Sequence, residues 1–194
     1  MSDRMRSFLA SPALLAASAL LFAFFVGSVL PAEAAKAAAY TPPGAAFDTS
    51  FFYSPNAAFE RAAAYGVEGR LAYIAARWSF DLVWPLVYGL FALAAWAFGL
   101  ERLGAAERIG RVFGAAPHRV LLWIPVLGPL FDYLENAAAT VVMASAPARP
   151  LVWGLVASAA TPLKWIFVLA GIGGALVMPG IVFLRSVLRR ARNR

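Results

Sequence analysis

The chain has 194 residues, of which 62% are hydrophobic and 14% charged, and its mean hydropathy is +0.72. These values lie outside the usual range of soluble domains and are typical of integral membrane proteins. Because a spanning helix needs about 20 residues, the length suits one membrane domain of three or four helices. The chain has no cysteine, which excludes disulfides, thiol catalysis and Cys-ligated metal centres.

The basic residues gather beside the apolar segments. The chain carries 17 Lys and Arg against 10 Asp and Glu, a net charge of +7. Basic residues precede the first apolar segment, fill the connection 101–119 and end the chain in the tail 185–194. Because cytoplasmic segments are enriched in Lys and Arg, this pattern predicts cytoplasmic termini in a multi-pass protein of the inner or plasma membrane. It favours the lipid bilayer, and not nucleic acid, as the partner.

Four apolar segments predict four transmembrane helices, near residues 8–30, 71–100, 120–146 and 151–184. The predicted fold class is therefore an all-α integral membrane bundle of four helices, a single domain over 1–194. The last three segments exceed the roughly 30 Å hydrocarbon core, so we expect them to tilt, kink or project beyond it. Prolines offer kinks at Pro85, Pro125, Pro129 and Pro162, and Pro179-Gly180 offers an end to the fourth span before a basic amphipathic tail.

The first apolar segment has two interpretations. Arg4 and Arg6, the apolar run and Ala32-Glu33-Ala34 together resemble a signal peptide with a small-residue cleavage site. The run from Ala13 to Leu30 is about 18 residues, longer than the roughly 7 to 15 of a signal peptide, which favours a retained helix. Cleavage would leave three spans without changing the orientation of the others.

The segment 31–70 is predicted to be an external connection. Its Pro42-Pro43-Gly44 turn is followed by aromatic residues, which are Phe47, Phe51, Phe52, Tyr53, Phe59 and Tyr65. One interpretation is a loop with a short helix resting on the lipid headgroups, where aromatic rings are favoured. The other is a lid that gates the entry of a ligand from the outer leaflet.

Five ionisable residues lie inside the predicted spans, where each costs about 2.5 to 3.5 kcal/mol and is expected to face the bundle interior. They are Arg77, Asp81, Asp132, Glu135 and Lys164, and helical spacing places Tyr88, Asn136 and Thr161 on the same faces. Four of the five ionisable residues, Asp81, Asp132, Glu135 and Lys164, lie about 16 to 23 Å below the external ends, so they can converge. Arg77 lies higher, and its side chain either joins the others or snorkels outward. Three acids would face two bases, so we expect Asp132 or Glu135 to be protonated.

These residues support several functions. They could lock the helices in register, or line a pocket for a hydrophobic or lipid-like ligand, in a non-catalytic binding or accessory protein with a membrane partner or a second copy. Alternatives are a membrane enzyme with Asp132 or Glu135 as general acid or base on a lipid-like substrate, and a small proton-coupled transporter. We favour the non-catalytic function. The one histidine, His118, lies in the basic connection, so we expect no haem, metal or other cofactor.

Three motifs between residues 47 and 168 stand out: Gly66-Val67-Glu68-Gly69-Arg70-Leu71-Ala72-Tyr73, Asp81 with Pro85 and Tyr88, and the Phe-Asp-x-x-Glu-Asn motif of Phe131-Asp132-Tyr133-Leu134-Glu135-Asn136. With these motifs the sequence resembles, over roughly residues 47–168, an uncharacterised family of small four-helix membrane proteins of bacterial type. The resemblance implies a four-helix bundle and emphasises Asp81, Asp132, Glu135 and Asn136, without implying an activity.

In architecture alone the chain is similar to the EXPERA superfamily of sterol isomerases and sigma-2-type receptors. That resemblance implies four helices, a long first external connection and intramembrane acids that engage a cationic ligand or carbocation. The isomerases pair their acids with histidine, and this chain has no histidine in its predicted spans, so we do not expect isomerase activity.

Overall fold

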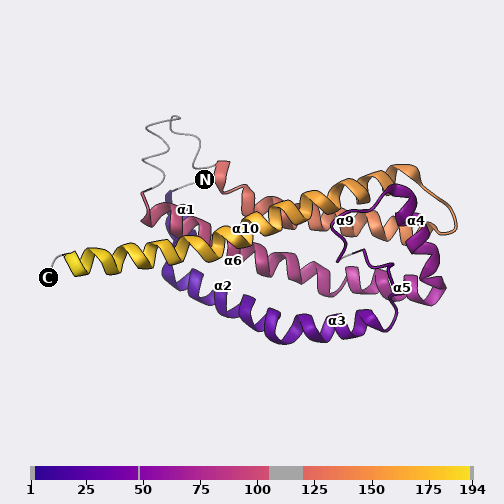
Figure 1. Cartoon of the computed structure of the whole chain (residues 1–194), viewed down its shortest axis with the longest axis horizontal. Coiled ribbons are helices and arrows are strands. Elements are labelled where there is room, and N and C mark those ends of the chain that lie inside the picture. Colours follow the sequence, from indigo (N-terminus) through magenta and orange to yellow (C-terminus); the bar gives the residue numbers. More distant parts are fainter. Residues whose placement is uncertain (1–2, 48, 105–119, 193–194) are drawn as a thin grey trace. The chain divides into compact units, whose positions relative to one another are not determined.

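The computed structural model describes residues 3–47, 49–104 and 120–192. In these residues every regular element is a helix and there is no strand, which confirms the all-α prediction (Figure 1). In chain order the elements are α1 (Asp3–Leu9), α2 (Pro12–Phe24), the π-helix η1 (Phe25–Val29), α3 (Leu30–Ala38), α4 (Pro55–Ala64), α5 (Gly66–Arg77), α6 (Phe80–Arg102), α9 (Ile124–Ser145) and α10 (Leu151–Arg192).

Three helical stretches of the described chain are long and apolar enough to cross a membrane. They are Pro12–Ala38, Gly66–Arg102 and Leu151–Arg192, with 27, 37 and 42 residues. The helix α9 has 22 residues but carries Asp132, Glu135 and Asn136, and it is not one of the three. Length and composition are thus compatible with a membrane protein, whereas the predicted count of four spans is not confirmed.

Capping residues explain where several helices begin. Ser11 accepts a hydrogen bond from the Leu14 amide (3.2 Å) at the start of α2, and Ser54 accepts one from the Ala57 amide (3.2 Å) at the start of α4. In both helices a proline follows the capping serine, at a position where its missing N–H costs nothing. Gly66, at φ +64, turns the chain between α4 and α5 in a conformation that favours glycine.

Helix boundaries differ from the prediction at several points. The first long helix continues to Ala38, and the second begins at Gly66 inside the segment predicted to be a connection. The prediction that Pro179-Gly180 ends the fourth span is wrong, because α10 runs through both residues to Arg192. An apolar helix tolerates a proline when its other backbone groups stay bonded. His118 and the arginines of the basic connection, Arg108, Arg111 and Arg119, lie outside the described residues.

The chain forms two compact units. Unit 1 contains Met1–Phe22, Val87–Leu127 and Phe167–Arg194, and unit 2 contains Ala23–Leu86 and Gly128–Ile166. In unit 1, Trp96 of α6 donates a hydrogen bond from Nε1 to the Gly171 carbonyl of α10 (2.8 Å), and Phe22 stacks on Phe91 with ring centroids 4.8 Å apart. Gly174 permits this approach, since a Cβ there would lie 2.4 Å from the Trp96 ring.

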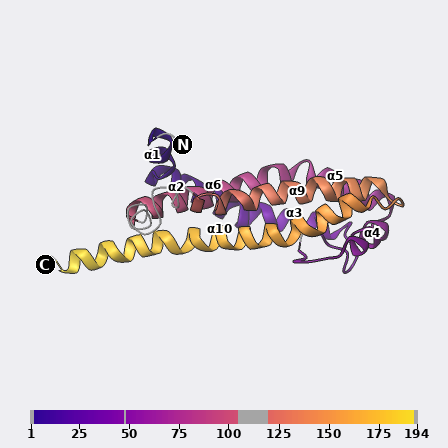
Figure 2. The same cartoon turned by 90° about the horizontal axis from the view of Figure 1, so that it is seen from above.

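Aromatic residues of the segment 40–73 build the core of unit 2. They pack on alanines and other small or flexible residues of α9 and α10, and the buried set is Phe47, Tyr53, Phe59, Tyr65, Tyr73, Ala138, Ala139, Val142, Met143 and Ala157. The close packing extends to Gly154, where a Cβ would lie 2.7 Å from Phe59. Figures 1 and 2 show α4 beside the connected ends of α9 and α10. This core fixes the surroundings of the buried charges described next.

Candidate functional site

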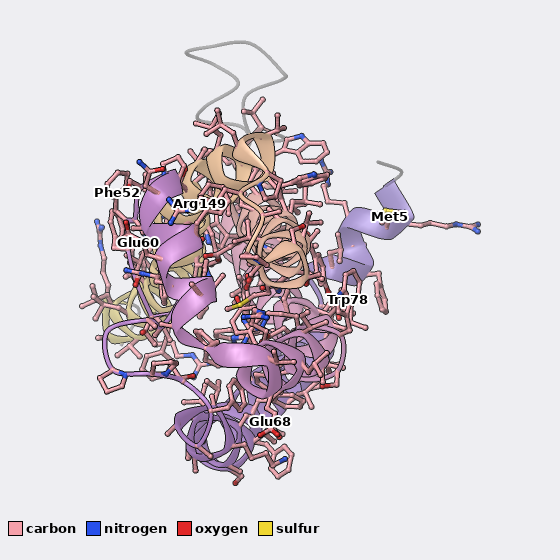
Figure 3. All side chains as sticks on the ribbon, turned by 90° about the vertical axis from the view of Figure 1, so that its right-hand side faces the viewer. Met5, Phe52, Glu60, Glu68, Trp78 and Arg149 are labelled. Atoms are coloured by element: carbon pink, nitrogen blue, oxygen red, sulfur yellow. The ribbon has the colours of Figure 1, made fainter. Side chains whose placement is uncertain are left out.

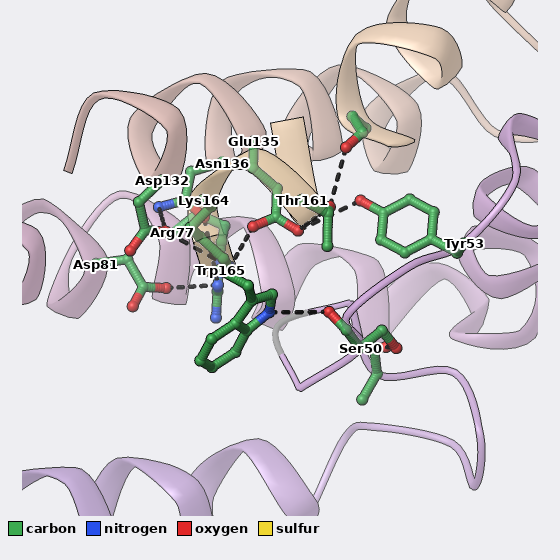
Figure 4. Close-up of polar contacts among 12 residues, drawn as sticks. Ser50, Tyr53, Arg77, Asp81, Asp132, Glu135, Asn136, Thr161, Lys164 and Trp165 are labelled. Carbon is green, nitrogen blue, oxygen red and sulfur yellow. Dashed lines mark hydrogen bonds and ion pairs between the residues drawn. The ribbon is translucent and has the colours of Figure 1, made fainter. Parts of the chain in front are cut away.

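Among the described charged residues of unit 2, Glu135 of α9 is the most enclosed, with 1% of its surface exposed. Its Oε1 accepts hydrogen bonds from the Thr161 hydroxyl (2.5 Å) and from the Tyr53 hydroxyl (3.4 Å), and its Oε2 is paired with the Lys164 ammonium (Figure 4). The three partners come from α10 and from the segment before α4. One carboxylate therefore joins three parts of the chain that lie far apart in the sequence.

A second ion pair lies on the neighbouring helices. Arg77 at the end of α5 is 2.7 Å from Asp81 at the start of α6, and it donates a hydrogen bond to Oδ1 of Asn136 (3.5 Å). Its guanidinium lies over the ring of Tyr73, 4.7 Å from the centroid. The predicted alternative that Arg77 snorkels outward is wrong, because the residue is 8% exposed and bound on three sides.

Asp132 and Asn136 connect the two ion pairs. Asn136 donates from Nδ2 to Oδ1 of Asp132 (3.5 Å), and Oδ1 of Asp132 is 3.8 Å from Lys164 Nζ. The connection follows from the i, i+3, i+4 spacing of the acidic and amide residues on α9, which places them on one face. We call this set the polar cluster, and its members are Tyr53, Arg77, Asp81, Asp132, Glu135, Asn136, Thr161 and Lys164.

The polar cluster contains three carboxylates and two cations, which gives one negative charge in excess if every group is ionised. The expectation that Asp132 or Glu135 holds a proton stays a prediction. Of the two, Glu135 has the closer partners, a paired ammonium and two hydroxyl donors.

Further contacts hold the chain just before α4 against the helices. Arg61 donates hydrogen bonds to the Ala46 carbonyl and the Ser50 hydroxyl, both at 2.7 Å, and its guanidinium lies 4.9 Å from the ring centre of Tyr53. Trp165 of α10 donates from Nε1 to the Ser50 carbonyl (3.0 Å), as Figure 4 shows. The segment before α4 is thus held by Arg61 of α4 and by Trp165 of α10.

The aromatic residues of the predicted connection divide into two groups. Phe47, Tyr53, Phe59 and Tyr65 are buried in the core of unit 2, which contradicts their expected position on the headgroups. Phe51 and Phe52 are exposed, at 54% and 68%, and Figure 3 shows Phe52 pointing outward. The segment buries some of its rings and exposes others, and the sequence alone does not say which.

The structure brings together seven of the eight predicted site residues. Tyr88 belongs to unit 1, where it is 3% exposed, and its participation stays a prediction. Sequence reasoning missed Tyr53 as a partner of Glu135, and it missed the contacts of Arg61 and Trp165. The hydrogen bond from Tyr53 spans 82 residues, so no local spacing reveals it.

In the described part of the chain, no group of three or more His, Cys, Asp or Glu side chains is arranged to hold a metal ion. Comparison of the chain with protein-family models, with curated proteins and with solved structures gives no match. The chemistry of the polar cluster is that of a hydrogen-bonded ion network with most of its charge enclosed. The contacts themselves are therefore the basis for assigning its function.

Proposed function

We propose that the chain is a multi-pass membrane protein with four spans, formed by α2–α3, α5–α6, α9 and α10. The three long apolar stretches support this proposal by length and composition. At 1.5 Å per residue, the 22 residues of α9 extend about 33 Å, which matches the hydrocarbon core of a bilayer. The polar residues Glu135 and Asn136 of α9 are 1% and 5% exposed, so they would not face lipid.

The distribution of charge supports cytoplasmic termini in the inner or plasma membrane. In unit 1, which holds both chain ends, the described basic residues are Arg4, Arg6, Arg102, Arg185, Arg189, Arg190 and Arg192, against the acids Asp3 and Glu101. In unit 2 the described charges balance, with the bases Lys36, Arg61, Arg70, Arg77, Arg149 and Lys164 against the acids Glu33, Glu60, Glu68, Asp81, Asp132 and Glu135. A concentration of Arg marks the cytoplasmic side of membrane proteins.

For the polar cluster we propose a structural role. The protein itself would be a non-catalytic binding or accessory protein for a membrane partner or a hydrophobic ligand. The observation that carries this proposal is the enclosure of Glu135, whose oxygens are engaged by Lys164, Thr161 and Tyr53 at 1% exposure. A network whose members satisfy each other fixes the arrangement of the segments that supply them. Its cost in desolvation is offset only while every partner is present.

An enzyme that uses Glu135 as its acid or base receives less support. A general base needs its proton donor within hydrogen-bond reach, about 2.6 to 3.2 Å, in the bound substrate. The side chains around Glu135 already hold the positions that a substrate would need. A proton-coupled transporter would require the Glu135 carboxylate to exchange protons with water during its cycle. The 1% exposure of Glu135 gives this function less support as well.

The experiment compares wild-type protein with Glu135→Gln and with Glu60→Gln, an exposed acid of α4 that serves as the matched control. Each protein is extracted from its membrane in mild detergent, and its mass, bound small molecules and unfolding temperature are measured. The intact mass also reports whether the first span is retained. Alkaline extraction of the membranes tests whether the chain is integral.

We expect Glu135→Gln to unfold at a lower temperature and to carry the same bound molecules as wild type, with Glu60→Gln unchanged. The structural role is refuted if Glu135→Gln is as stable as wild type and has lost a molecule that wild type retains. That result would assign a ligand site to Glu135. Release of the chain by alkali would refute the membrane location separately.

A further inference from the structure

The last three turns of α10 form an amphipathic, arginine-rich helix. Arg185, Arg189 and Arg192 follow the i, i+4, i+7 spacing and so share one flank. The apolar residues Phe183, Leu184, Val187 and Leu188 line another flank with the i, i+1, i+4, i+5 spacing. These three arginines are therefore separated from the apolar residues around the helix axis, whereas Arg190, at i+3 from Val187, borders the apolar flank.

The apolar flank is uncovered within unit 1. Phe183 is 71% exposed, Leu184 57%, Val187 44% and Leu188 60%. In Figures 1 and 2 the last turns of α10 extend past the other described helices of unit 1. Exposed Phe and Leu on a single flank of a helix mark an interaction surface.

Charge decides between the possible occupants of this flank. Arg185, Arg189, Arg190 and Arg192 lie within the last eight described residues, and no acid lies in α10. A second copy docked in parallel would bring two such arginine groups together. An anionic lipid surface instead supplies phosphates to the arginines and an acyl boundary to the apolar flank.

We propose that residues 181–192 bind the anionic phospholipids of the leaflet from which α10 emerges. The inference rests on the proposed function, in which α10 crosses the bilayer. The arginines then lie among the headgroup phosphates, and Leu184 and Leu188 enter the boundary between headgroups and acyl chains. Each arginine is expected to raise the affinity for an anionic surface about fivefold.

The absence of cysteine permits a direct test with single introduced thiols. Leu188→Cys places a fluorophore on the apolar flank, and Ser186→Cys places one on the arginine side two residues away. The full chain is reconstituted into vesicles of phosphatidylcholine, with or without about 30% phosphatidylglycerol, which supplies the anionic surface. Access of a water-soluble quencher to each fluorophore is then measured.

We expect the fluorophore at position 188 to be protected several-fold better in the anionic vesicles, and the one at 186 to stay accessible in both. Replacing the four arginines by Gln should remove the difference, as should high salt, whereas Arg149→Gln, just before the start of α10, should keep it. Equal access in both vesicle types would overturn the proposal. So would protection that depends on the ratio of protein to lipid, because that result assigns the flank to a second copy.

Flotation of the vesicles separates the two proposals. If the chain does not float with vesicles of either composition, the proposed membrane location is wrong. A chain that floats and shows no anionic protection at position 188 keeps that location and loses the lipid site.

Discussion

Replacing Lys164 by Met should be the most destabilising single change in the polar cluster. The substitution keeps an unbranched side chain one atom shorter and removes the ammonium that pairs with Glu135, a carboxylate that is 1% exposed. Only the hydroxyls of Thr161 and Tyr53 would then remain of its three partners described above. Removing one partner of a buried ion pair costs about 3 to 5 kcal/mol, because an uncompensated charge is left in the interior.

The structure also predicts that the reciprocal change is milder. In Glu135→Gln the ammonium of Lys164 keeps Asp132 at 3.8 Å, and the amide that replaces the carboxylate can still accept from the two hydroxyls. We therefore expect a loss of about 1.5 to 3 kcal/mol, as for a hydrogen bond to a charged group. The exposed control Glu60→Gln should change the free energy of unfolding by less than about 0.5 kcal/mol.

The assay is a titration of the purified protein from lipid-containing micelles into a denaturing detergent, with tryptophan fluorescence as the signal. A loss of about 3 to 5 kcal/mol raises the ratio of unfolded to folded protein between a hundredfold and a few thousandfold. The reasoning is refuted if Lys164→Met is no less stable than Glu60→Gln. It is also refuted if Glu135→Gln is the less stable of the two cluster variants, because the order follows from the second partner of the lysine.

Three other predictions follow from single contacts. Thr161→Val should lower the free energy of unfolding by about 1.5 to 3 kcal/mol through the lost hydrogen bond to a carboxylate, whereas Thr161→Ser should keep most of it in the same titration. Gly174→Ala should lower it by about 1 to 3 kcal/mol because its Cβ would meet an indole ring at 2.4 Å, whereas Gly173→Ala, in open space, should be neutral or stabilising. Arg61→Met should speed amide exchange over residues 44–47 and 49–53, next to the two groups that it bonds, and unchanged exchange there would contradict the role given to those bonds.

The helical class and much of the polar cluster could be predicted because both depend on local spacing. The pair of Arg77 and Asp81 is four residues apart, and the acids of α9 follow the i, i+3 pattern of one face. On α10, Thr161 and Lys164 are three residues apart and both buried, which agrees with the prediction that they share a face. An ionisable side chain in an apolar helix is costly in free energy unless it meets a partner, so this cost also predicts that the charges converge.

The role of the aromatic segment could not be predicted in this way. Tyr53 reaches Glu135 across 82 residues, and Arg61 reaches back 15 residues to the Ala46 carbonyl. Both contacts depend on how the chain returns to the helices, which no periodicity encodes. The predicted end of the fourth span at Pro179-Gly180 was wrong for another reason. Proline and glycine are weak stop signals where the helix is otherwise apolar.

A buried ion network is a poor source of stability, so its presence calls for another explanation. Apolar residues of similar volume often give equal or greater stability than a buried ion pair, whereas a polar group can fix register. The faces of α9 and α10 in unit 2 are rich in alanine, and such surfaces offer several registers of similar packing. We infer that the polar cluster selects one register. Cysteine pairs placed along these faces should crosslink in a single register in wild type, and in several once Glu135, Thr161 and Lys164 are all replaced by apolar residues. A single register in that variant would show that packing alone specifies the arrangement.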